Sequence, residues 1–415
     1  MSEVIEKGKL AKQASYKMAR LTTEEKNKGL EQISKQLLKD QEFILEENKK
    51  DIEDGKDAGL TQAVLDRIQL NEERIQGIAT SIEQVIDLTD PIGDVLEQME
   101  HAKGLQIEKR RVPIGVIGMI YEARPNVTID AAALTLKTGN SVILRGSSSA
   151  KHSNIAIVKS IHEALEEAAL PKDAVQLIED TSRETAKDLF TLNDYLDVLI
   201  PRGSQSLIDT VVQQATVPVI VTGAGNCHVY VDDSAKKEMA EEIVLNAKLQ
   251  RPSVCNAIES LLIERDWFNK NGKDLIARLQ ENDVEIFADE EITDQISGLK
   301  QATEEDWGTE YLGLTISVKL VKDVEEAVDH INTYGTQHSE AIVTENEESK
   351  DHFLQNVDAT TVYHNASTRF TDGFEFGYGA EIGISTQKLH ARGPMGLNAL
   401  TSSKIFVTGT GQIRN

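Results

Sequence analysis

The 415-residue sequence has few cysteines, a shortage of positive charge and no long apolar run. Only Cys227 and Cys255 occur, so a disulfide framework is not expected and a reducing cytoplasm fits. The 44 lysines and arginines stand against 69 aspartates and glutamates, and a net charge of −25 argues against nucleic acid as a partner, because phosphate contacts need a basic surface. No run is long enough to span a membrane, and the first residues lack the apolar core of a signal peptide. We therefore expect a cytoplasmic globular protein that binds neither membrane nor nucleic acid.

Helical and strand patterns divide the chain into successive stretches. Residues 1–90 show the spacing of amphipathic helices, and Thr22 with Glu25 predicts a capping box. From 112 to 223, helical patterns alternate with short apolar runs, which lie at 112–120, 141–144, 174–178, 198–200 and 217–221. This alternation predicts a mostly parallel sheet covered on both faces, with the carboxyl ends of its strands at one edge. A second α/β stretch is predicted from 229 to about 363.

Two glycine-containing turns follow predicted strands of the first α/β stretch. Each joins a strand to a helix, so glycine lets the backbone approach a ligand and the free N–H groups of the helix start can bind phosphate. Neither turn is a G-x-G-x-x-G fingerprint, and each alone is more often an ordinary βα turn. Together they favour a dinucleotide, and their arginines favour the 2′-phosphate of NADP over NAD. The candidate cofactor-binding residues in the two turns are Arg145, Gly146, Ser147, Ser148, Arg202, Gly203 and Ser204.

Cys255 lies in the segment 250–256, between a predicted helix and a predicted strand. A lone cysteine is most often a small buried apolar residue, which is the alternative to a nucleophile here. The adjacent Arg251 would lower the pKa of the thiol and favour a reactive thiolate. Cys227 has only a neighbouring histidine, and the sequence shows no cysteine or histidine spacing typical of a metal site. A bound metal is therefore not expected.

Four segments resemble the aldehyde dehydrogenase superfamily in their order and spacing. They read YEARPNV at 121–127, VTGAGNCHVYV at 221–231, QRPSVCN at 250–256 and GAEIGISTQKLHARGPMG at 379–396. Within the superfamily, the last segment is similar to that of the reductases that act on glutamyl phosphate. The resemblance covers nearly the full length. It implies NADPH-dependent reduction of L-glutamyl 5-phosphate to L-glutamate 5-semialdehyde with release of phosphate, the second step of L-proline biosynthesis from glutamate.

The resemblance implies roles for individual residues at the reaction centre. Cys255 matches the thiol that attacks the acyl phosphate and forms a thioester, which then accepts hydride. Asn126 matches the side-chain amide that stabilises the tetrahedral oxyanion together with the Cys255 backbone N–H. Thr222 stands where hydrolytic members have a general-base glutamate, so the thioester should survive until hydride or phosphate reaches it.

The resemblance also implies how the ligands are held. Arg145 takes the place of a lysine that binds the cofactor ribose, and Ser148 that of a glutamate which NAD-preferring members often use. Glu310 resembles the carboxylate that holds the nicotinamide ribose, and Gly223 the glycine that allows close approach near the nicotinamide. Arginine offers paired donors to carboxylate and phosphate, although an ion pair with a surface carboxylate is the alternative role at each position. The candidates for the anionic groups of the substrate are Arg124, Arg251, His390 and Arg392.

The implied fold is α/β and aldehyde dehydrogenase-like. It combines a Rossmann-type doubly wound cofactor domain, an α/β catalytic domain and a small β oligomerisation element. We expect the NADP-binding domain at 1–94 and 113–225 with about 366–399, the catalytic domain at 226–365, and the oligomerisation element at 95–112 and 400–415. The implied partners are the small-molecule substrate, further copies of the chain and, transiently, the upstream glutamate kinase. Two other functions stay open, namely a related acylating or oxidising dehydrogenase with another acyl substrate, and a catalytically silent scaffold of the same fold.

Overall fold

The structure, a computed structural model, describes residues 2–414, and the chain divides into two compact units. Unit 1 comprises Met1–Val221, Gly377–Gly383 and Met395–Asn415, and unit 2 comprises Thr222–Phe376 and Ile384–Pro394. Unit 2 thus contains Cys255. It also contains residues 366–376 and 384–394, although the sequence predicted that about 366–399 belongs to the cofactor domain. Each unit is built round its own parallel sheet.

Helices form the first part of unit 1. They are α1 (Glu3–Met18), α2 (Thr23–Lys39), α3 (Gln41–Asp57), α4 (Gln62–Ile68) and α5 (Glu72–Asp87). The predicted capping box opens α2, because the Thr22 hydroxyl accepts from the Glu25 N–H and the Glu25 carboxylate accepts from the Thr22 N–H at 2.8 Å. The buried face of α5 carries apolar side chains at helical spacing, namely Ile75, Ile78, Ile82 and Val85.

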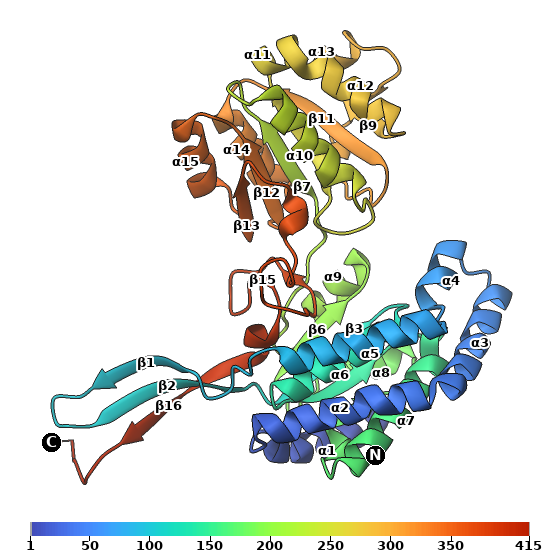
Figure 1. The fold of residues 1–415 in the computed structure, drawn as a ribbon, viewed down its shortest axis with the longest axis vertical. Coiled ribbons are helices and arrows are strands. Elements are labelled where there is room, and N and C mark those ends of the chain that lie inside the picture. Colours follow the sequence, from blue (N-terminus) through green and yellow to red (C-terminus); the bar gives the residue numbers. More distant parts are fainter. Residues whose placement is uncertain (1, 415) are drawn as a thin grey trace. The chain divides into compact units, whose positions relative to one another are not determined.

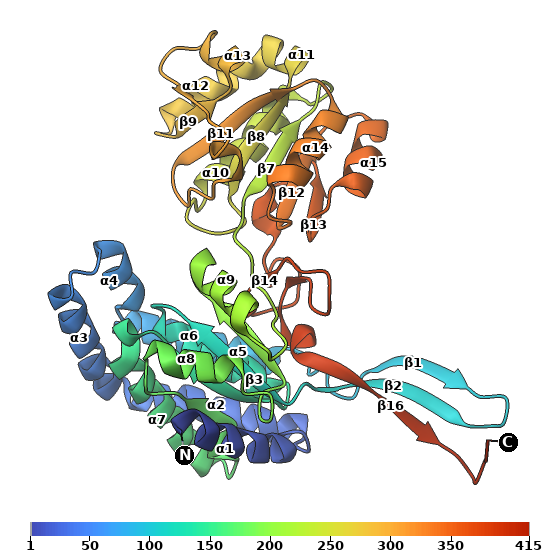
Figure 2. The same cartoon turned by 180° about the vertical axis from the view of Figure 1, so that it is seen from behind.

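The main sheet of unit 1 has the strand order β5-β4-β3-β6, and its strands are parallel. They are β3 (Val116–Tyr121), β4 (Ser141–Arg145), β5 (Val175–Leu177) and β6 (Val198–Arg202), and the helices between and after them are α6 (Pro125–Lys137), α7 (Lys151–Glu167), α8 (Arg183–Phe190) and α9 (Gln205–Gln214). The α1, α8 and α9 helices share an apolar core with one face of the sheet, and α6 and α7 cover the other (Figures 1 and 2). The predicted doubly wound arrangement is confirmed.

Two details of this sheet differ from the prediction. The apolar run at 217–221 is not a strand, because Pro218 has no backbone N–H to donate, and within the described chain Val219 makes an isolated bridge instead. The run at 112–120 is split between two sheets. The break falls at Gly115, whose φ of 133° disfavours any residue with a side chain.

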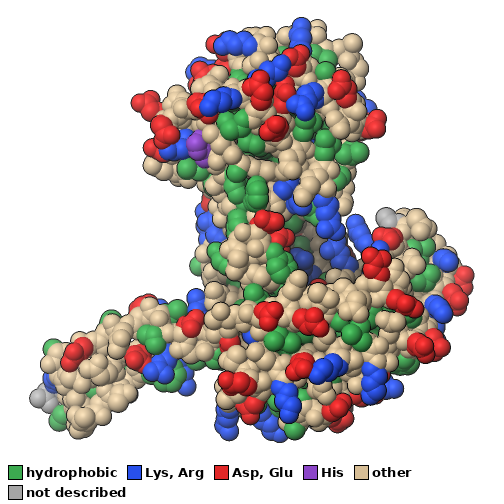
Figure 3. Space-filling model, viewed as in Figure 1, with side chains coloured by type: hydrophobic (Ala, Val, Ile, Leu, Met, Phe, Trp, Pro, Cys, Tyr) green, Lys and Arg blue, Asp and Glu red, His purple; other side chains and the backbone are tan. Residues whose placement is uncertain are grey.

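Unit 1 also carries a three-stranded antiparallel sheet with the order β1-β2-β16. Its strands are β1 (Val95–Glu100), β2 (Gln106–Pro113) and β16 (Thr401–Thr408). Because β16 pairs along the whole of β2, the segments near 95–112 and 400–415 form one element, which extends away from the rest of unit 1 (Figure 1). Apolar side chains are exposed among charged ones on this sheet (Figure 3), and they are Val95, Leu96, Met99, Ile405, Phe406 and Val407.

Unit 2 is built on a parallel sheet with the strand order β10-β9-β11-β8-β7-β12-β13. Its strands are β7 (Cys227–Val231), β8 (Ile258–Glu264), β9 (Glu285–Ala288), β10 (Lys300–Gln301), β11 (Thr315–Val321), β12 (Ser339–Val343) and β13 (Thr361–His364). Its helices are α10 (Lys237–Leu249), α11 (Arg265–Trp267), α12 (Lys273–Glu281), α13 (Glu290–Thr293), α14 (Val324–Tyr334) and α15 (Glu347–Asn356). A short antiparallel pair, β14 (Ile384–Ser385) and β15 (Gly393–Pro394), belongs to the same unit.

Side chains of the central strands of unit 2 alternate between two apolar cores. Val229 and Val231 of β7 belong to a core shared with α10 and α12, whereas Tyr230 belongs to one shared with α14 and α15. Helices therefore cover both faces of the sheet (Figures 1 and 2). Burial on both faces explains why the central strands are continuous apolar runs in the sequence. None of the helices in the described residues is long and apolar enough to cross a membrane.

Candidate active site

Cys255 lies on a loop, residues 250–256, between the end of α10 and the start of β8. The thiol-bearing residue is half-buried. The loop is fastened by the buried Asn256, whose side-chain amide donates to the backbone carbonyls of Arg369 at 3.3 Å and Thr371 at 2.9 Å. This Cys255 loop is therefore anchored from within, while its candidate nucleophile stays accessible.

The chain that enters β7 packs directly against the Cys255 loop. A Cβ on Gly225 would lie 1.6 Å from the Cys255 carbonyl oxygen, so glycine is needed for this approach. The Cys227 thiol donates to the same carbonyl at 3.1 Å. Burial raises the pKa of Cys227 well above its usual value, so this cysteine stays a protonated thiol and Cys255 is the accessible one of the two.

Glu310 contacts the same stretch of chain. Its carboxylate accepts a hydrogen bond from the Gly225 N–H at 2.6 Å, and burial raises the pKa of Glu310. The turn before Glu310 is held by the buried side chain of Asn226, which donates to the Trp307 carbonyl at 2.8 Å and to the Tyr334 carbonyl at 2.9 Å. Glu310 is thereby tied to the backbone that supports Cys255.

A buried ion pair supports the same turn from β8. Lys248 and Glu259 are fully buried and their charged atoms lie 2.5 Å apart. Glu259 also accepts a hydrogen bond from the N–H of Leu312, two residues beyond Glu310, at 3.1 Å. Burial raises the pKa of Glu259 to about 7, against the opposing effect of the Lys248 ammonium. The charge of Lys248 offsets the cost of burying the Glu259 carboxylate.

His228, next to Cys227, is a structural residue. It is fully buried in β7, and its Nδ1 atom lies 2.9 Å from the carboxylate of Glu340, which is also fully buried. Burial lowers the pKa of His228 to about 3, so the imidazole is neutral at physiological pH and enclosed in the core. In the described part of the chain, no group of three or more His, Cys, Asp or Glu side chains is arranged to hold a metal ion.

Arg369 is a site residue that the sequence analysis missed. Its Nε donates to the Gln250 side chain at 2.7 Å, and its carbonyl accepts from Asn256, so it touches both ends of the Cys255 loop. Burial lowers the pKa of Arg369, and the charge of nearby Arg251 lowers it further. Two arginines therefore flank Cys255. No motif marks Arg369, which lies more than a hundred residues further along the chain.

The segment 384–394 carries two of the predicted substrate residues. The Arg392 guanidinium binds the Asp358 carboxylate at 3.0 Å, and Lys388 binds the same carboxylate at 2.6 Å. The hydrogen bond from Lys388 and the charge of Arg392 hold the pKa of Asp358 below its usual value. His390 is exposed and has a φ of 60°, in the left-handed region. In this structure Arg392 thus serves in an ion pair, the alternative role considered for it.

Gly223, another predicted site residue of unit 2, lies against this segment. A Cβ on Gly223 would lie 2.7 Å from the Thr386 hydroxyl oxygen, so the backbone approaches closely here. The adjacent Thr222 is buried and forms a backbone bridge with Ser385. The position of the general-base glutamate is therefore taken by a buried threonine.

Arg124 and Asn126 belong to unit 1, at the start of α6. Arg124 is the N-cap residue, and both side chains are exposed. The Asn126 amide donates to the Asp130 carboxylate, one turn further on, at 3.4 Å. Burial raises the pKa of Asp130 to about 6, against the opposing effects of this hydrogen bond and of the Arg202 charge.

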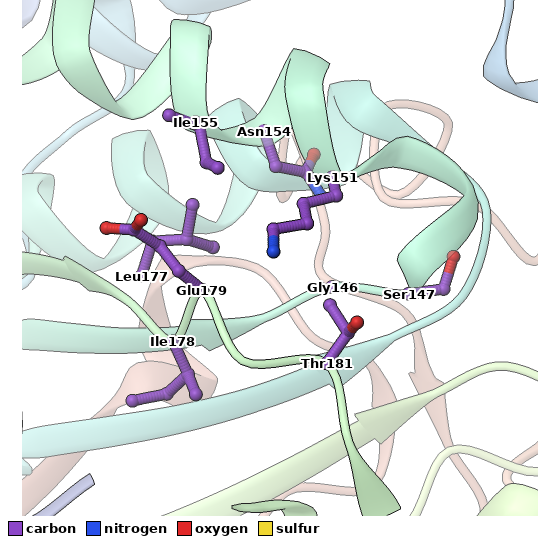
Figure 4. A pocket seen from close by; sticks show the side chains of 9 residues that line it. All are labelled: Gly146, Ser147, Lys151, Asn154, Ile155, Leu177, Ile178, Glu179 and Thr181. Atoms are coloured by element: carbon purple, nitrogen blue, oxygen red, sulfur yellow. The ribbon is translucent and has the colours of Figure 1, made fainter. Parts of the chain in front are cut away.

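A small pocket lies at the carboxyl ends of β4 and β5 in unit 1 (Figure 4). It contains the predicted turn residues Gly146 and Ser147, and a Cβ on Gly146 would lie 2.2 Å from the Asn154 side chain. The lining residues of this α7 pocket are Gly146, Ser147, Lys151, Asn154, Ile155, Leu177, Ile178, Glu179 and Thr181. Arg145 is bound beside it, donating to the carbonyls of Thr181 at 2.6 Å and Ser182 at 3.0 Å.

Carboxylates of the chain itself bind the two helix starts at which phosphate was predicted. The Asp51 carboxylate accepts from the N–H groups of His152 and Ser153, at 3.0 and 2.8 Å, in the first turn of α7. The Glu122 carboxylate accepts from the Ser204 N–H at 2.7 Å and its hydroxyl at 3.1 Å, before the first turn of α9. Both helix starts attract anions as expected, and intramolecular anions already satisfy them.

A model of the aldehyde dehydrogenase family matches residues 2–297, and the chain belongs to this family. The relatives that it resembles in particular are named gamma-glutamyl phosphate reductase. That of Oceanobacillus iheyensis is 64% identical and that of Bacillus subtilis 63%, each over 414 residues and covering 100% of both chains. The crystal structure of gamma-glutamyl phosphate reductase from Thermotoga maritima is 45% identical, with a TM-score of 0.98 and 100% of both chains covered. These findings confirm the resemblance and the aldehyde dehydrogenase-like fold.

Proposed function

We propose that this chain reduces L-glutamyl 5-phosphate to L-glutamate 5-semialdehyde, with NADPH as the hydride donor and release of phosphate. Full-length identity of 64% and 63% to relatives named gamma-glutamyl phosphate reductase supports this reaction. The observation that carries the mechanism is Cys255, an accessible thiol on a loop that buried contacts anchor. The reaction would be the second step of proline biosynthesis, and we expect it to take place in the cytoplasm.

Cys255 acts as the nucleophile in this proposal. Its thiolate attacks the acyl carbon, the bond from that carbon to the phosphate oxygen breaks, and phosphate leaves with the electron pair. The oxyanion of the tetrahedral state is stabilised by the side-chain amide of Asn126 and by the Cys255 backbone N–H. NADPH supplies the hydride when it is bound. Reduction at the thioester carbon then breaks the carbon–sulfur bond and returns the Cys255 thiolate.

The residue at the general-base position implied by the resemblance favours a long-lived thioester. Thr222 is buried and carries no carboxylate, so it does not activate water as a general base would. The buried His228 is likewise removed from the solvent. Loss of the acyl group to water is thereby slowed, and the thioester persists until hydride or, in the reverse direction, phosphate reacts with it.

In unit 1, the α7 pocket is the proposed place for one end of a dinucleotide, since it lies at the carboxyl ends of β4 and β5 and Ser147 adds a polar side chain to its lining. The proposed cofactor residues of unit 1 are Arg145, Gly146, Ser147, Ser148, Arg202, Gly203 and Ser204. In unit 2 we propose Glu310 for the nicotinamide ribose and Gly223 for close approach of the nicotinamide.

The substrate phosphate and carboxylate would be bound by arginine. Arg251 and Arg369 are the first candidates, because Arg251 belongs to the Cys255 loop and Arg369 contacts it. Arg124, His390 and Arg392 remain proposals, and Arg392 would have to exchange its Asp358 partner for the substrate.

Further copies of this chain are the proposed macromolecular partner, through the β1-β2-β16 sheet. That sheet exposes apolar side chains on an element that extends from unit 1 (Figure 1), and such surfaces mark interaction sites. A transient contact with the upstream glutamate kinase is proposed because the acyl phosphate is labile in water.

The reverse reaction tests the proposal. Purified protein is mixed with L-glutamate 5-semialdehyde, NADP and inorganic phosphate, and NADPH is followed by absorbance. We expect turnover that requires phosphate and that falls by at least about a thousandfold in Cys255→Ser, because a neutral hydroxyl is a far poorer nucleophile than a thiolate. Cys227→Ser is the matched control and should keep most of the activity.

Each other outcome points to a named alternative. Turnover without phosphate would indicate a hydrolytic dehydrogenase with a general base elsewhere. Turnover only with another aldehyde would indicate a different acyl substrate. A folded protein with no turnover under any of these conditions would indicate a catalytically silent scaffold.

A further inference from the structure

We propose that Lys151 selects NADPH over NADH by binding the 2′-phosphate of its adenosine ribose. This inference rests on the proposed function, because it concerns the cofactor pocket of unit 1. The α7 pocket is formed by the turns after β4 and β5, and Lys151 is the first residue of α7 between them. Carboxyl ends of adjacent parallel strands are where the ribose of a dinucleotide is bound in doubly wound sheets.

Lys151 is the cation of this pocket. Of the described residues that line it, Lys151 is the sole lysine or arginine. Its side chain is exposed and turns its amino group into the hollow, between Gly146 and the end of β5 (Figure 4). An ammonium on a flexible stem is suited to a phosphate dianion, which it meets as a point charge.

Other phosphate-binding groups near the pocket have partners within the chain for some of their donors. The Arg145 guanidinium donates to the carbonyls of Thr181 and Ser182, and so holds the loop after β5. The N–H groups of His152 and Ser153 in the first turn of α7 are bound by the Asp51 carboxylate. Arg145 keeps its positive charge and a buried Nε without a partner among the described residues, but it does not line the pocket, whereas Lys151 does. We therefore expect a phosphate in the pocket to meet the charge of Lys151 first.

Glu179 is the residue of this pocket that would favour NAD over NADP. It follows β5, where dinucleotide-binding folds often place a carboxylate that binds the ribose hydroxyls of NAD and repels a 2′-phosphate. The Glu179 carboxylate, however, lies 3.3 Å from the ammonium of Lys7, which also donates to the Leu177 carbonyl. Lys7 also pairs with Glu3, at 2.7 Å, so it offsets only part of the negative charge of Glu179, and the charge of Lys151 also lowers the pKa of the neighbouring Asp180. Among the described lining residues Lys151 still supplies the positive charge, and the test therefore includes Glu179 as the competing residue.

Equilibrium binding of two nucleotide fragments tests this role without catalysis. The dissociation constants of 2′,5′-ADP and 5′-AMP are measured by calorimetry on the full-length protein and on Lys151→Gln. Lys159→Gln is the matched control, since Lys159 lies on the same helix with its ammonium 4.8 Å from the ring centre of Phe43, outside the pocket lining. We expect Lys151→Gln to weaken 2′,5′-ADP about tenfold and 5′-AMP less than twofold. Lys151→Arg should retain most of the preference.

The outcomes separate this inference from the function on which it rests. If the wild type prefers 2′,5′-ADP and Lys151→Gln keeps that preference, Lys151 is not the selecting residue, although NADPH remains the cofactor. If the wild type does not distinguish the fragments, both the NADPH assignment and the role of Lys151 are wrong, whereas the reaction at Cys255 is still measured with NADH. A gain of 2′,5′-ADP binding in Glu179→Gln, with none lost in Lys151→Gln, would assign selection to Glu179 instead.

Discussion

The α7 pocket of unit 1 lies at the carboxyl ends of strands in its sheet, whereas the Cys255 loop of unit 2 lies at the amino ends of strands in its own sheet. The pocket is at the carboxyl ends of β4 and β5, where helices begin and backbone N–H groups are available. The Cys255 loop follows the end of α10 and precedes β8, so it lies at the amino ends of its neighbouring strands. The end of a helix carries partial negative charge, which does not favour a thiolate. The arginines that flank Cys255 supply the positive charge that the backbone lacks there.

The two regions also differ in what supports them. In the α7 pocket Lys151 is exposed and Ser147 half-buried, and exchanging these two residues should alter binding with little effect on folding. Beneath the Cys255 loop and Glu310, the supporting groups are fully buried, as with Lys248, Glu259 and Asn226. Substitutions of these buried groups should lower the free energy of unfolding more than they change the catalytic activity of the folded protein.

The largest effect is expected from Lys248→Met. Removing the ammonium leaves the Glu259 carboxylate buried without its partner, which should cost about 3–5 kcal/mol of unfolding free energy. Denaturant unfolding measures this loss. The matched control is Lys35→Met, which breaks an exposed helix pair with Glu31 and should cost less than about 1 kcal/mol. Equal losses of unfolding free energy in Lys248→Met and Lys35→Met would contradict the view that the buried ion pair supports the fold more than the exposed one.

If Arg369 binds the anionic substrate and favours the Cys255 thiolate, as we propose, Arg369→Gln should lower kcat/KM for the acyl phosphate about tenfold. Initial rates measure the loss, and alkylation of Cys255 by iodoacetamide at several pH values separates the two causes. Arg278→Gln is the control, since Arg278 pairs with Glu241 on another part of unit 2. Unchanged kinetics in Arg369→Gln would remove Arg369 from the site.

Asp130→Asn should change how stability depends on pH. Burial raises the pKa of Asp130 to about 6 from a usual value near 4, so folding favours its protonated form. That contribution is complete at low pH and is lost as the pH rises through about 6. The variant should therefore equal the wild type near pH 4 and be more stable by about 1 kcal/mol at pH 8. Unfolding curves at both pH values check this, with the exposed Asp209→Asn as control; a gain at pH 4 instead would reverse the sign of the argument.

The smallest effect is expected from Glu122→Gln. Neutralising the carboxylate that binds the start of α9 should make that helix start more attractive to the cofactor phosphates, tightening NADPH binding about threefold. NADPH fluorescence on binding measures this change, and Glu184→Gln at the start of α8 is the control. Weaker binding in Glu122→Gln would show that Glu122 shapes the turn rather than competing with the ligand.

Much of the fold was predictable because its signals are local. The capping box at Thr22, the helical face of α5 and the alternation of strands and helices between 112 and 214 all depend on residues within a few positions of one another. The errors had local causes as well, namely Pro218 in the run at 217–221 and Gly115 in the run at 112–120. Within the second α/β stretch the sequence signal of single strands is weaker, since the run Ser339–Val343 of β12 is short and contains the buried Glu340.

The candidate site was predictable only in part. The position of Cys255 between a helix and a strand follows from the chain around it, and its proposed role from the family resemblance. Arg369, which touches the Cys255 loop from more than a hundred residues away, belongs to no motif. Lys151 was overlooked for another reason, since a lysine at a helix start is ordinary in sequence, and the pocket around it requires β5 as a wall.

The sequence by itself determined the family, most of the order of helices and strands in unit 1, and Cys255 as the candidate nucleophile. These follow from periodicity and from motifs in which the informative residues are neighbours. Only the tertiary structure decided that Asp51 and Glu122 bind the two helix starts, that Lys248 neutralises Glu259, and that Lys151 is left to face the pocket. The physical reason is that the interaction between two charges depends on their distance in space. Folding brings together groups that are far apart along the chain, and their sequence separation does not reveal which of them will be close.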